Sequence, residues 1–368
     1  MKDYGNPLTH VVSIPPYPPG RPTDAVAREF GLDPASIVKL ASNESPHGVA
    51  PGVIAALAEV DAASNIYPDF DCYDLRHAIA ADVGMAPDQV LPGAGSSEII
   101  LLAARAYLDG TRKAIIPQYG FQSYEGAVRS VGATPVFVPV KDWVPDIDAM
   151  LAAVDDDVHL VYLASPNNPT GTVLPRAEIE RFAQALPPHV LLVLDEAYRE
   201  FLAPEDRPDI ARLFQMRRNL IVMRTFSKIH GLAGLRVGYG LGDGELLQVL
   251  RRLQLPFSVS AQAQAAAIAS LSDSTFLERN RVENESERAR VAAALEKAGV
   301  RILPSGGNFL LLEVGDGPAI SRELMRRGVI IRPVANYGLP TWIRATIGLP
   351  RENDVFLGAL DEVLRAAG

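Results

Sequence analysis

The sequence predicts an α/β protein whose larger part is a mostly parallel sheet between two layers of helices. Short apolar runs at residues 114–116, 134–138, 158–163, 190–194 and 220–223 alternate with amphipathic stretches of helix length. Runs of Val, Ile and Leu spaced in this way indicate strands that are buried on both faces, as in a parallel sheet. A chain of 368 residues is long enough for about two domains.

Three regions are expected along the chain. Residues 1–40 contain Pro15, Pro16, Pro18 and Pro19, which favour an extended arm that packs on the small domain or on a partner chain. Residues 41–255 form the large α/β domain. Residues 256–368 form a smaller α+β domain, which begins with one long bridging helix over residues 261–298. Three strand-like runs follow that helix, at residues 308–314, 329–332 and 342–347.

The composition excludes several classes of protein. A net charge of -9 without a basic run argues against a nucleic-acid surface. The single cysteine, Cys72, excludes an intrachain disulfide framework and favours a reducing compartment. Residues 1–7 lack the apolar core of a signal peptide, and no apolar run reaches the length of about 18 residues that a membrane helix needs. We therefore expect a cytoplasmic protein without a nucleic-acid, membrane or metal partner.

Lys228 is the most informative residue of the chain. It is one of only six lysines, and it follows the apolar run at residues 220–223. A lysine at a strand end is often no more than a solvated surface charge. Here Asp195 and Tyr198 follow the preceding strand, so that an amine, a carboxylate and a phenol meet. This set suits pyridoxal phosphate, with a Schiff-base lysine, a carboxylate that keeps the pyridine nitrogen protonated and a phenol partner.

A phosphate site is predicted at residues 91–100, which follow a short strand and open a helix. Free backbone N–H groups and the helix dipole favour an anion there, although a plain helix cap by a serine is the simpler alternative. A dinucleotide fingerprint is disfavoured, because Glu98 stands where its third glycine belongs. An arginine fork and two hydroxyls would complete the site. The residues expected at the phosphate are Gly95, Ser96, Ser97, Thr225, Ser227 and Arg236.

Two further residues are expected beside the cofactor ring. Asn168 follows the strand that ends near residue 164, at the edge where the carboxyl ends of parallel strands meet, and with Tyr198 it would hold the ring oxygen. An Asn-Pro pair also starts turns for local reasons. Tyr119 follows the strand at residues 114–116 and could stack on the ring face, with a core tyrosine as the alternative.

These motifs together resemble the fold-type-I aminotransferases, and the chain is similar to histidinol-phosphate aminotransferases along nearly its whole length. The resemblance implies the three-layer fold of that group and catalysis by Lys228, Asp195 and Tyr198. Lys228 would carry the cofactor and move the proton between the substrate α-carbon and the cofactor C4′. The matching segments are residues 40–48, 67–69, 93–100, 168–171, 195–198, 227–236, 332–333 and 344–348.

The resemblance also implies a homodimer and a set of substrate-binding residues. Tyr67 would reach the phosphate of the cofactor in the partner subunit. Four residues would bind the anionic groups of the substrate. The alternative for the two arginines among them is that they are ordinary surface charges. These four residues are Tyr17, Asn43, Arg332 and Arg344.

The implied reaction is transamination of L-histidinol phosphate with 2-oxoglutarate, a ping-pong step of histidine biosynthesis. Ser45, Ser97 and residues 305–307 depart from the family pattern near the phosphate loop or the substrate side. Three alternatives therefore remain. They are an aromatic amino-acid aminotransferase, a relative that aminates a biosynthetic ketone and a phosphothreonine-type decarboxylase of the same fold. A non-catalytic regulator would need a DNA-binding segment, which the first forty residues are too short and too proline-rich to supply.

Overall fold

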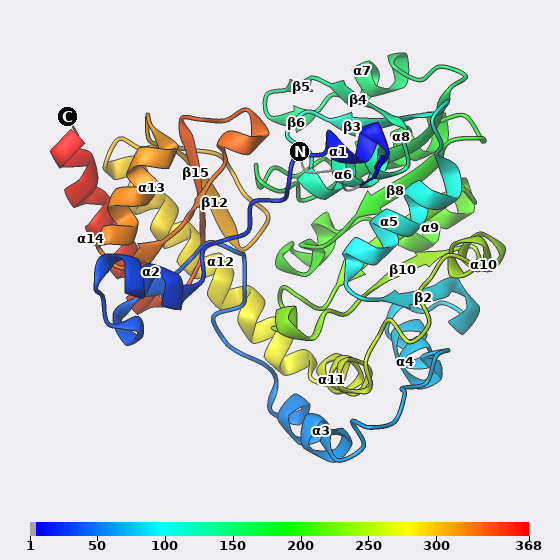
Figure 1. The fold of residues 1–368 in the computed structure, drawn as a ribbon, viewed down its shortest axis with the longest axis horizontal. Coiled ribbons are helices and arrows are strands. Elements are labelled where there is room, and N and C mark those ends of the chain that lie inside the picture. Colours follow the sequence, from blue (N-terminus) through cyan, green and yellow to red (C-terminus); the bar gives the residue numbers. More distant parts are fainter. Residues whose placement is uncertain (1–4, 368) are drawn as a thin grey trace.

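The chain folds around one large and one small sheet that a long helix joins, in a computed structural model that describes residues 5–367 (Figure 1). Residues 1–4 lie outside the described residues. They belong to the expected N-terminal arm and to the segment that was expected to lack a signal peptide. The joining helix, α12, spans Ser274–Lys297. Across residues 5–367, every helix is too short or too polar to cross a membrane.

The large sheet confirms the predicted mostly parallel arrangement. Its seven strands lie in the order β2-β10-β9-β8-β7-β3-β4. Strands β9, β8, β7, β3 and β4 pair in parallel, and β10 is antiparallel to both of its neighbours. The strands are β2 (Val90–Gly93), β3 (Lys113–Pro117), β4 (Thr134–Val138), β7 (Val158–Ala164), β8 (Leu191–Asp195), β9 (Leu220–Thr225) and β10 (Gly238–Gly242).

Strand β10 was not predicted, because glycine has a low strand propensity and this strand contains three. The glycines are needed for close packing. A Cβ atom at Gly238 would lie 2.4 Å from the backbone nitrogen of Ser96, and one at Gly240 would lie 3.2 Å from Ile99. The strand can therefore lie directly against the start of the helix that begins at Ser96.

Helices cover both faces of the large sheet, as the three-layer fold requires (Figure 1). Residues of α5 (Ser96–Tyr107), α6 (Gln122–Ser130) and α10 (Gly244–Arg251) form the core on one face. The opposite core draws on α4 (Tyr73–Val83), α7 (Ile147–Ala152), α8 (Arg176–Ala185), α9 (Ile210–Met216) and α11 (Ala261–Leu271). Helix α3 (Pro51–Asp61) packs on α11, and β5 (Val140–Lys141) and β6 (Val144–Pro145) form a short hairpin.

The small sheet has the order β11-β12-β15-β14. A separate core joins it to the end of α12 and to two further helices. The expected strand at residues 329–332 divides into two short strands, of which β13 pairs with β1 and β14 pairs with β15. These elements are β1 (Val38–Lys39), β11 (Arg301–Ile302), β12 (Phe309–Glu313), α13 (Gly317–Arg326), β13 (Val329–Ile330), β14 (Arg332–Pro333), β15 (Trp342–Thr346) and α14 (Pro350–Ala367).

The N-terminal segment is only partly extended, unlike the arm that its prolines suggested. It contains α1 (Thr9–Val12) and α2 (Thr23–Phe30). Helix α2 is well bounded, because Pro22 precedes it and Gly31 ends it in the left-handed conformation. Its residue Val26 is buried, and α2 contacts α13. Residues 23–40 thus pack against the small-sheet part of the same chain.

The expected single helix over residues 261–298 is two helices, α11 and α12. Asp273 interrupts it, because its side chain accepts a hydrogen bond from the backbone nitrogen of Phe276 and so caps the start of α12. Helix α11 contacts α3 and α4, and its buried alanines belong to the core of the large sheet. Helix α11 therefore packs with the large sheet.

Candidate active site

A cavity of about 490 Å³ lies at the carboxyl edge of the large sheet, where β7, β8 and β9 end. Side chains from the start of α5 and from β14 and β15 of the small sheet also line it. The cavity therefore collects residues from both parts of the chain. The predicted site residues that line it are Tyr17, Asn43, Ser96, Ser97, Asn168, Asp195, Tyr198, Thr225, Ser227, Lys228, Arg236, Arg332 and Arg344.

Lys228 lines this cavity. Its Nζ donates a hydrogen bond to the carbonyl of Ser42 at 3.2 Å and lies 5.6 Å from the centre of the Tyr198 ring. Burial lowers the pKa of Lys228 to about 7, and the positive charges of Arg344 and Arg236 act in the same direction. A substantial fraction of the amine is therefore neutral, and nucleophilic, near pH 7.

Both carboxylate oxygens of Asp195 are held by hydrogen bonds. The hydroxyl of Tyr124 donates to Oδ2 at 2.5 Å, and the backbone nitrogen of Ala197 donates to Oδ1 at 2.9 Å. Burial raises the pKa of Asp195 to about 6, and these two bonds oppose that rise. Tyr124 was not identified from the sequence, because it belongs to no motif and reads as an ordinary buried residue of an amphipathic helix.

Two further residues that line the cavity, Tyr198 and Asn168, can donate hydrogen bonds. Asn43 donates to the Tyr198 hydroxyl oxygen at 2.9 Å, and burial raises the pKa of Tyr198 to about 12, so its phenol stays protonated and can donate to a ligand. The Oδ1 atom of Asn168 accepts a bond from Arg344 at 2.5 Å, which leaves the Asn168 amide nitrogen as a donor.

An anion site lies at the first turn of α5, beside Arg236. The guanidinium of Arg236 donates to the carbonyl of Ala233 at 3.0 Å and to the hydroxyl of Ser227 at 3.4 Å. Gly95 precedes the helix with a φ of 75°, and a Cβ atom there would lie 2.7 Å from Arg236 Nη2. The missing side chain of Gly95 therefore lets the guanidinium lie against the positive end of the helix.

A pair of arginines lies on the small sheet. Arg332 and Arg344 are directly opposite each other in the β14–β15 register, and their exposed fractions are only 7% and 6%. Arg344 is anchored to the carbonyl of Ala41 at 2.8 Å, and the Arg332 guanidinium lies 5.4 Å from the centre of the Tyr17 ring. Like charges directly opposite in an antiparallel pair are destabilising. A bound anion would offset this repulsion.

Besides Gly95, two predicted site residues do not line the cavity of their own chain. Tyr119 stacks on Trp143 with ring centroids 5.5 Å apart, and Phe121, two residues later, lines the cavity instead. Tyr67 is 79% exposed and stacks on Phe257 at 4.6 Å. The sequence offered two aromatic residues close together in the loop that follows β3, and nothing in it distinguished which one faces the cavity.

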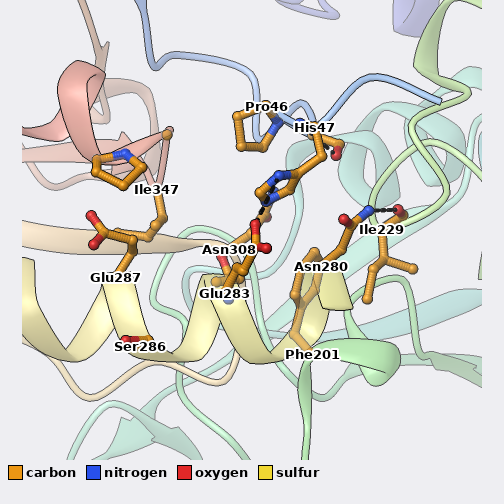
Figure 2. Close-up of a pocket in the computed structure, with 14 residues that line it drawn as sticks. Pro46, His47, Phe201, Ile229, Asn280, Glu283, Ser286, Glu287, Asn308 and Ile347 are labelled. Atoms are coloured by element: carbon orange, nitrogen blue, oxygen red, sulfur yellow. Dashed lines mark hydrogen bonds and ion pairs between the residues drawn. The ribbon is translucent and has the colours of Figure 1, made fainter. Parts of the chain in front are cut away.

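A smaller cavity of about 180 Å³ lies at the junction of the two parts, between residues 45–47, α12 and Ile347 (Figure 2). His47 Nδ1 lies 3.3 Å from the Glu283 carboxylate, and Asn280 donates to the carbonyl of Ile229 at 3.3 Å. It shares no lining residue with the larger cavity, but Ile229 directly follows Lys228. The Asn280 bond thus links the loop that carries Lys228 to α12. Within the part of the chain that the structure describes, no group of His, Cys, Asp or Glu side chains is arranged to hold a metal ion.

Comparison with known proteins decides the family. The model of the family "Aminotransferase class I and II" matches residues 35–360. The chain belongs to this aminotransferase family. Histidinol-phosphate aminotransferase 1 of Thiobacillus denitrificans is 46% identical over 97% of this chain and 93% of its own length. Relatives with this level of sequence identity support the conclusion that the chain is a pyridoxal-phosphate-dependent transferase that acts on small molecules.

Solved structures of other enzymes have the same fold. Histidinol-phosphate aminotransferase from Sinorhizobium meliloti, in complex with pyridoxal 5′-phosphate, superposes with a TM-score of 0.91 at 31% identity over 100% of both chains. L-threonine-O-3-phosphate decarboxylase from Porphyromonas gingivalis gives a TM-score of 0.78 at 26% identity, over 89% of this chain and 100% of its own. The fold is therefore shared by enzymes with different reactions.

The cavity of this aminotransferase fits pyridoxal phosphate. The primary amine of Lys228 and the carboxylate of Asp195 are the groups that the aldehyde and the pyridine nitrogen of the cofactor require. Arg236 and the first turn of α5, where Gly95 keeps the backbone accessible, could hold its phosphate. Phe121 supplies an apolar ring at the cavity wall.

Proposed function

We propose that the enzyme transfers the amino group of L-histidinol phosphate to 2-oxoglutarate in a ping-pong reaction of cytoplasmic histidine biosynthesis. The observation that carries this proposal is the opposed, buried pair Arg332 and Arg344 on the small sheet, whose charges could bind an anion in addition to the one proposed at Arg236. The name and the 46% identity of the Thiobacillus denitrificans relative support the same donor. The low content of cysteine, with Cys72 alone, fits a reducing compartment.

In this proposal, the large-sheet residues bind the cofactor. Arg236, the first turn of α5 and the Ser227 hydroxyl hold its phosphate, and Thr225 supports that loop by accepting a bond from the Ser227 backbone at 3.1 Å. Asp195 pairs with the pyridine nitrogen. Tyr198 and the Asn168 amide donate to the ring oxygen, and Phe121 packs near the ring.

The bound cofactor supplies an electron sink for the carbanion that forms at the substrate α-carbon. Lys228 moves the proton, because it is the one amine in the cavity and its pKa of about 7 lets it both accept and release a proton at neutral pH. Asn43 keeps Tyr198 in place through its 2.9 Å bond and is itself fixed by Thr346. These contacts orient the substrate carbon toward the lysine.

The substrate anions bind at the small sheet. Arg332 and Arg344 pair with the phosphate of histidinol phosphate in one half-reaction and with a carboxylate of 2-oxoglutarate in the other. Tyr17, which is 53% exposed and lies over Arg332, adds a hydroxyl from the N-terminal segment. The same two arginines thus serve both substrates.

The active unit of this proposal is a homodimer. Tyr67 is highly exposed and its neighbours Ile66 and Phe257 also expose apolar surface. Such a patch is typical of a face that a second copy covers. Tyr67 of each subunit would then reach the cofactor phosphate of the other subunit.

A panel of amino donors tests this proposal. L-Histidinol phosphate, L-phenylalanine, L-tyrosine and L-threonine phosphate are each offered with 2-oxoglutarate, and glutamate and carbon dioxide are measured. We expect histidinol phosphate to give the highest kcat/KM and no donor to release carbon dioxide. Faster conversion of phenylalanine or tyrosine would replace the proposal with an aromatic aminotransferase, and release of carbon dioxide would replace it with a decarboxylase.

A further inference from the structure

The hydroxyl of Tyr124 is held against Asp195 by tight packing. Tyr124 lies on α6, its ring is fully buried, and it stacks on Tyr162 with ring centroids 4.7 Å apart and planes 3° from parallel. The ring of Phe121 meets it edge-on at 5.8 Å. These contacts fix the ring, so the hydroxyl cannot turn away from the carboxylate that it meets at 2.5 Å.

We propose that Tyr124 is a positioning residue that keeps Asp195 ionised and oriented toward the pyridine nitrogen of the cofactor. This inference rests on the cofactor placement of the proposed function. Asp195 Oδ2 accepts from Tyr124, and Oδ1 accepts from the backbone of Ala197. The two donors come from different elements and fix both oxygens, which leaves one orientation for the carboxylate plane. A hydrogen bond to an ionised acceptor is stronger than one between neutral groups.

The charges around Asp195 show why such a donor is needed. Burial raises the pKa of Asp195, and the neighbouring Glu196 carboxylate acts in the same direction. The opposing groups are the Tyr124 hydroxyl from α6, the Ala197 backbone and the Lys228 charge from the loop after β9. Tyr198, from the same strand end as Asp195, also faces it and stays neutral. Because the lysine amine is partly neutral, the Tyr124 hydroxyl is the main side-chain group that favours the Asp195 anion.

Tyr124→Phe tests the proposal, with Tyr162→Phe as its matched control. Each variant removes one buried hydroxyl from the same stacked pair, but the Tyr162 hydroxyl donates to the carbonyl of Ile100 at 2.8 Å and does not touch Asp195. The holoenzymes are titrated from pH 5 to 9, and cofactor dissociation is measured with pyridoxal phosphate and with a carbocyclic analogue in which CH replaces the ring nitrogen.

We expect Tyr124→Phe to weaken pyridoxal phosphate binding about tenfold and to move the acid limb of kcat/KM up by about one pH unit, as expected for a lost bond to a charged group. The acid limb moves to higher pH because loss of the Tyr124 hydroxyl raises the pKa of Asp195, so that the Asp195 anion forms only at higher pH. Tyr162→Phe should move neither quantity. With the carbocyclic analogue, wild type and Tyr124→Phe should bind equally.

Two results would show that Tyr124 only fills space. One is equal behaviour of Tyr124→Phe and Tyr162→Phe, and the other is a Tyr124→Phe variant that binds the carbocyclic analogue as much more weakly than wild type as it binds pyridoxal phosphate. If Tyr124→Phe does not fold, proton NMR of the wild-type holoenzyme supplies the test. A downfield hydroxyl resonance should then persist in Tyr162→Phe and vanish in Asp195→Asn, and its persistence in both would overturn the proposal. If Asp195→Asn itself leaves cofactor binding unchanged, the cofactor placement fails rather than the role of Tyr124.

Discussion

Replacement of Arg344 by alanine is the most revealing change at the substrate end of the cavity. The guanidinium is anchored by Asn168 and by the carbonyl of Ala41, and it lies directly opposite Arg332. Its loss removes a charge-assisted bond to the substrate anion, which is worth about 1.5–3 kcal/mol. At about 1.4 kcal/mol for each factor of ten, KM should rise by about 10- to 150-fold.

The rise should be seen in both half-reactions, because histidinol phosphate and 2-oxoglutarate use the same guanidinium. Steady-state kinetics with each substrate varied in turn give the two KM values, and a cofactor titration shows whether the Asn168 side is disturbed. Arg344→Lys keeps the charge but loses the fork, so it should give a smaller increase. KM values within about twofold of wild type for both substrates, at full cofactor occupancy, would refute the assignment of Arg344 to the substrate anion.

Four further experiments test the other roles. Lys228→Ala should abolish transamination and the visible absorbance band of the lysine-bound cofactor, whereas Lys297→Ala should retain both; a band that survives in Lys228→Ala would contradict the role of Lys228. In the cofactor-free wild type, the rate of pyridoxal phosphate uptake should rise with pH through about 7 and then level, because the neutral amine of Lys228 reacts; a rise that continues toward pH 10 would contradict the lowered pKa. Asp195→Asn should keep the cofactor bound, although more weakly, and should raise the activation barrier for kcat by on the order of 3 kcal/mol. Turnover near that of wild type would show that the role of Asp195 is only structural. Tyr17→Phe should raise KM less than Arg344→Ala and mainly for the phosphate-bearing substrate, and an equal effect on 2-oxoglutarate would argue against that role.

The sequence predicted the sheet and most of the cavity because these depend on local signals. Buried parallel strands are continuous apolar runs, and their carboxyl ends lie at one edge, so the sequence places Asp195, Lys228 and Asn168 together. The antiparallel strand β10 was missed because its glycines serve close packing against α5, which is a tertiary requirement.

Side-chain direction was the other feature that the sequence did not reveal. Tyr119 and Phe121 follow the same strand, and the left-handed backbone at Tyr119, with a φ of 62°, turns its ring toward Trp143. Tyr124 reaches Asp195 across 71 positions of sequence, and no spacing rule connects α6 to the end of β8. Such contacts depend on how helices pack on the sheet.

The most direct test of the proposed function is a single-turnover comparison of L-histidinol phosphate with L-histidinol, which lacks only the phosphate. Each is mixed with the wild-type holoenzyme, and conversion of the cofactor from its pyridoxal to its pyridoxamine form is followed by absorbance. The paired arginines Arg332 and Arg344 predict that histidinol phosphate reacts at least about tenfold more efficiently, with most of the difference lost in Arg344→Ala. Equal efficiency of the two donors, or a preference for histidinol, would contradict the phosphate site.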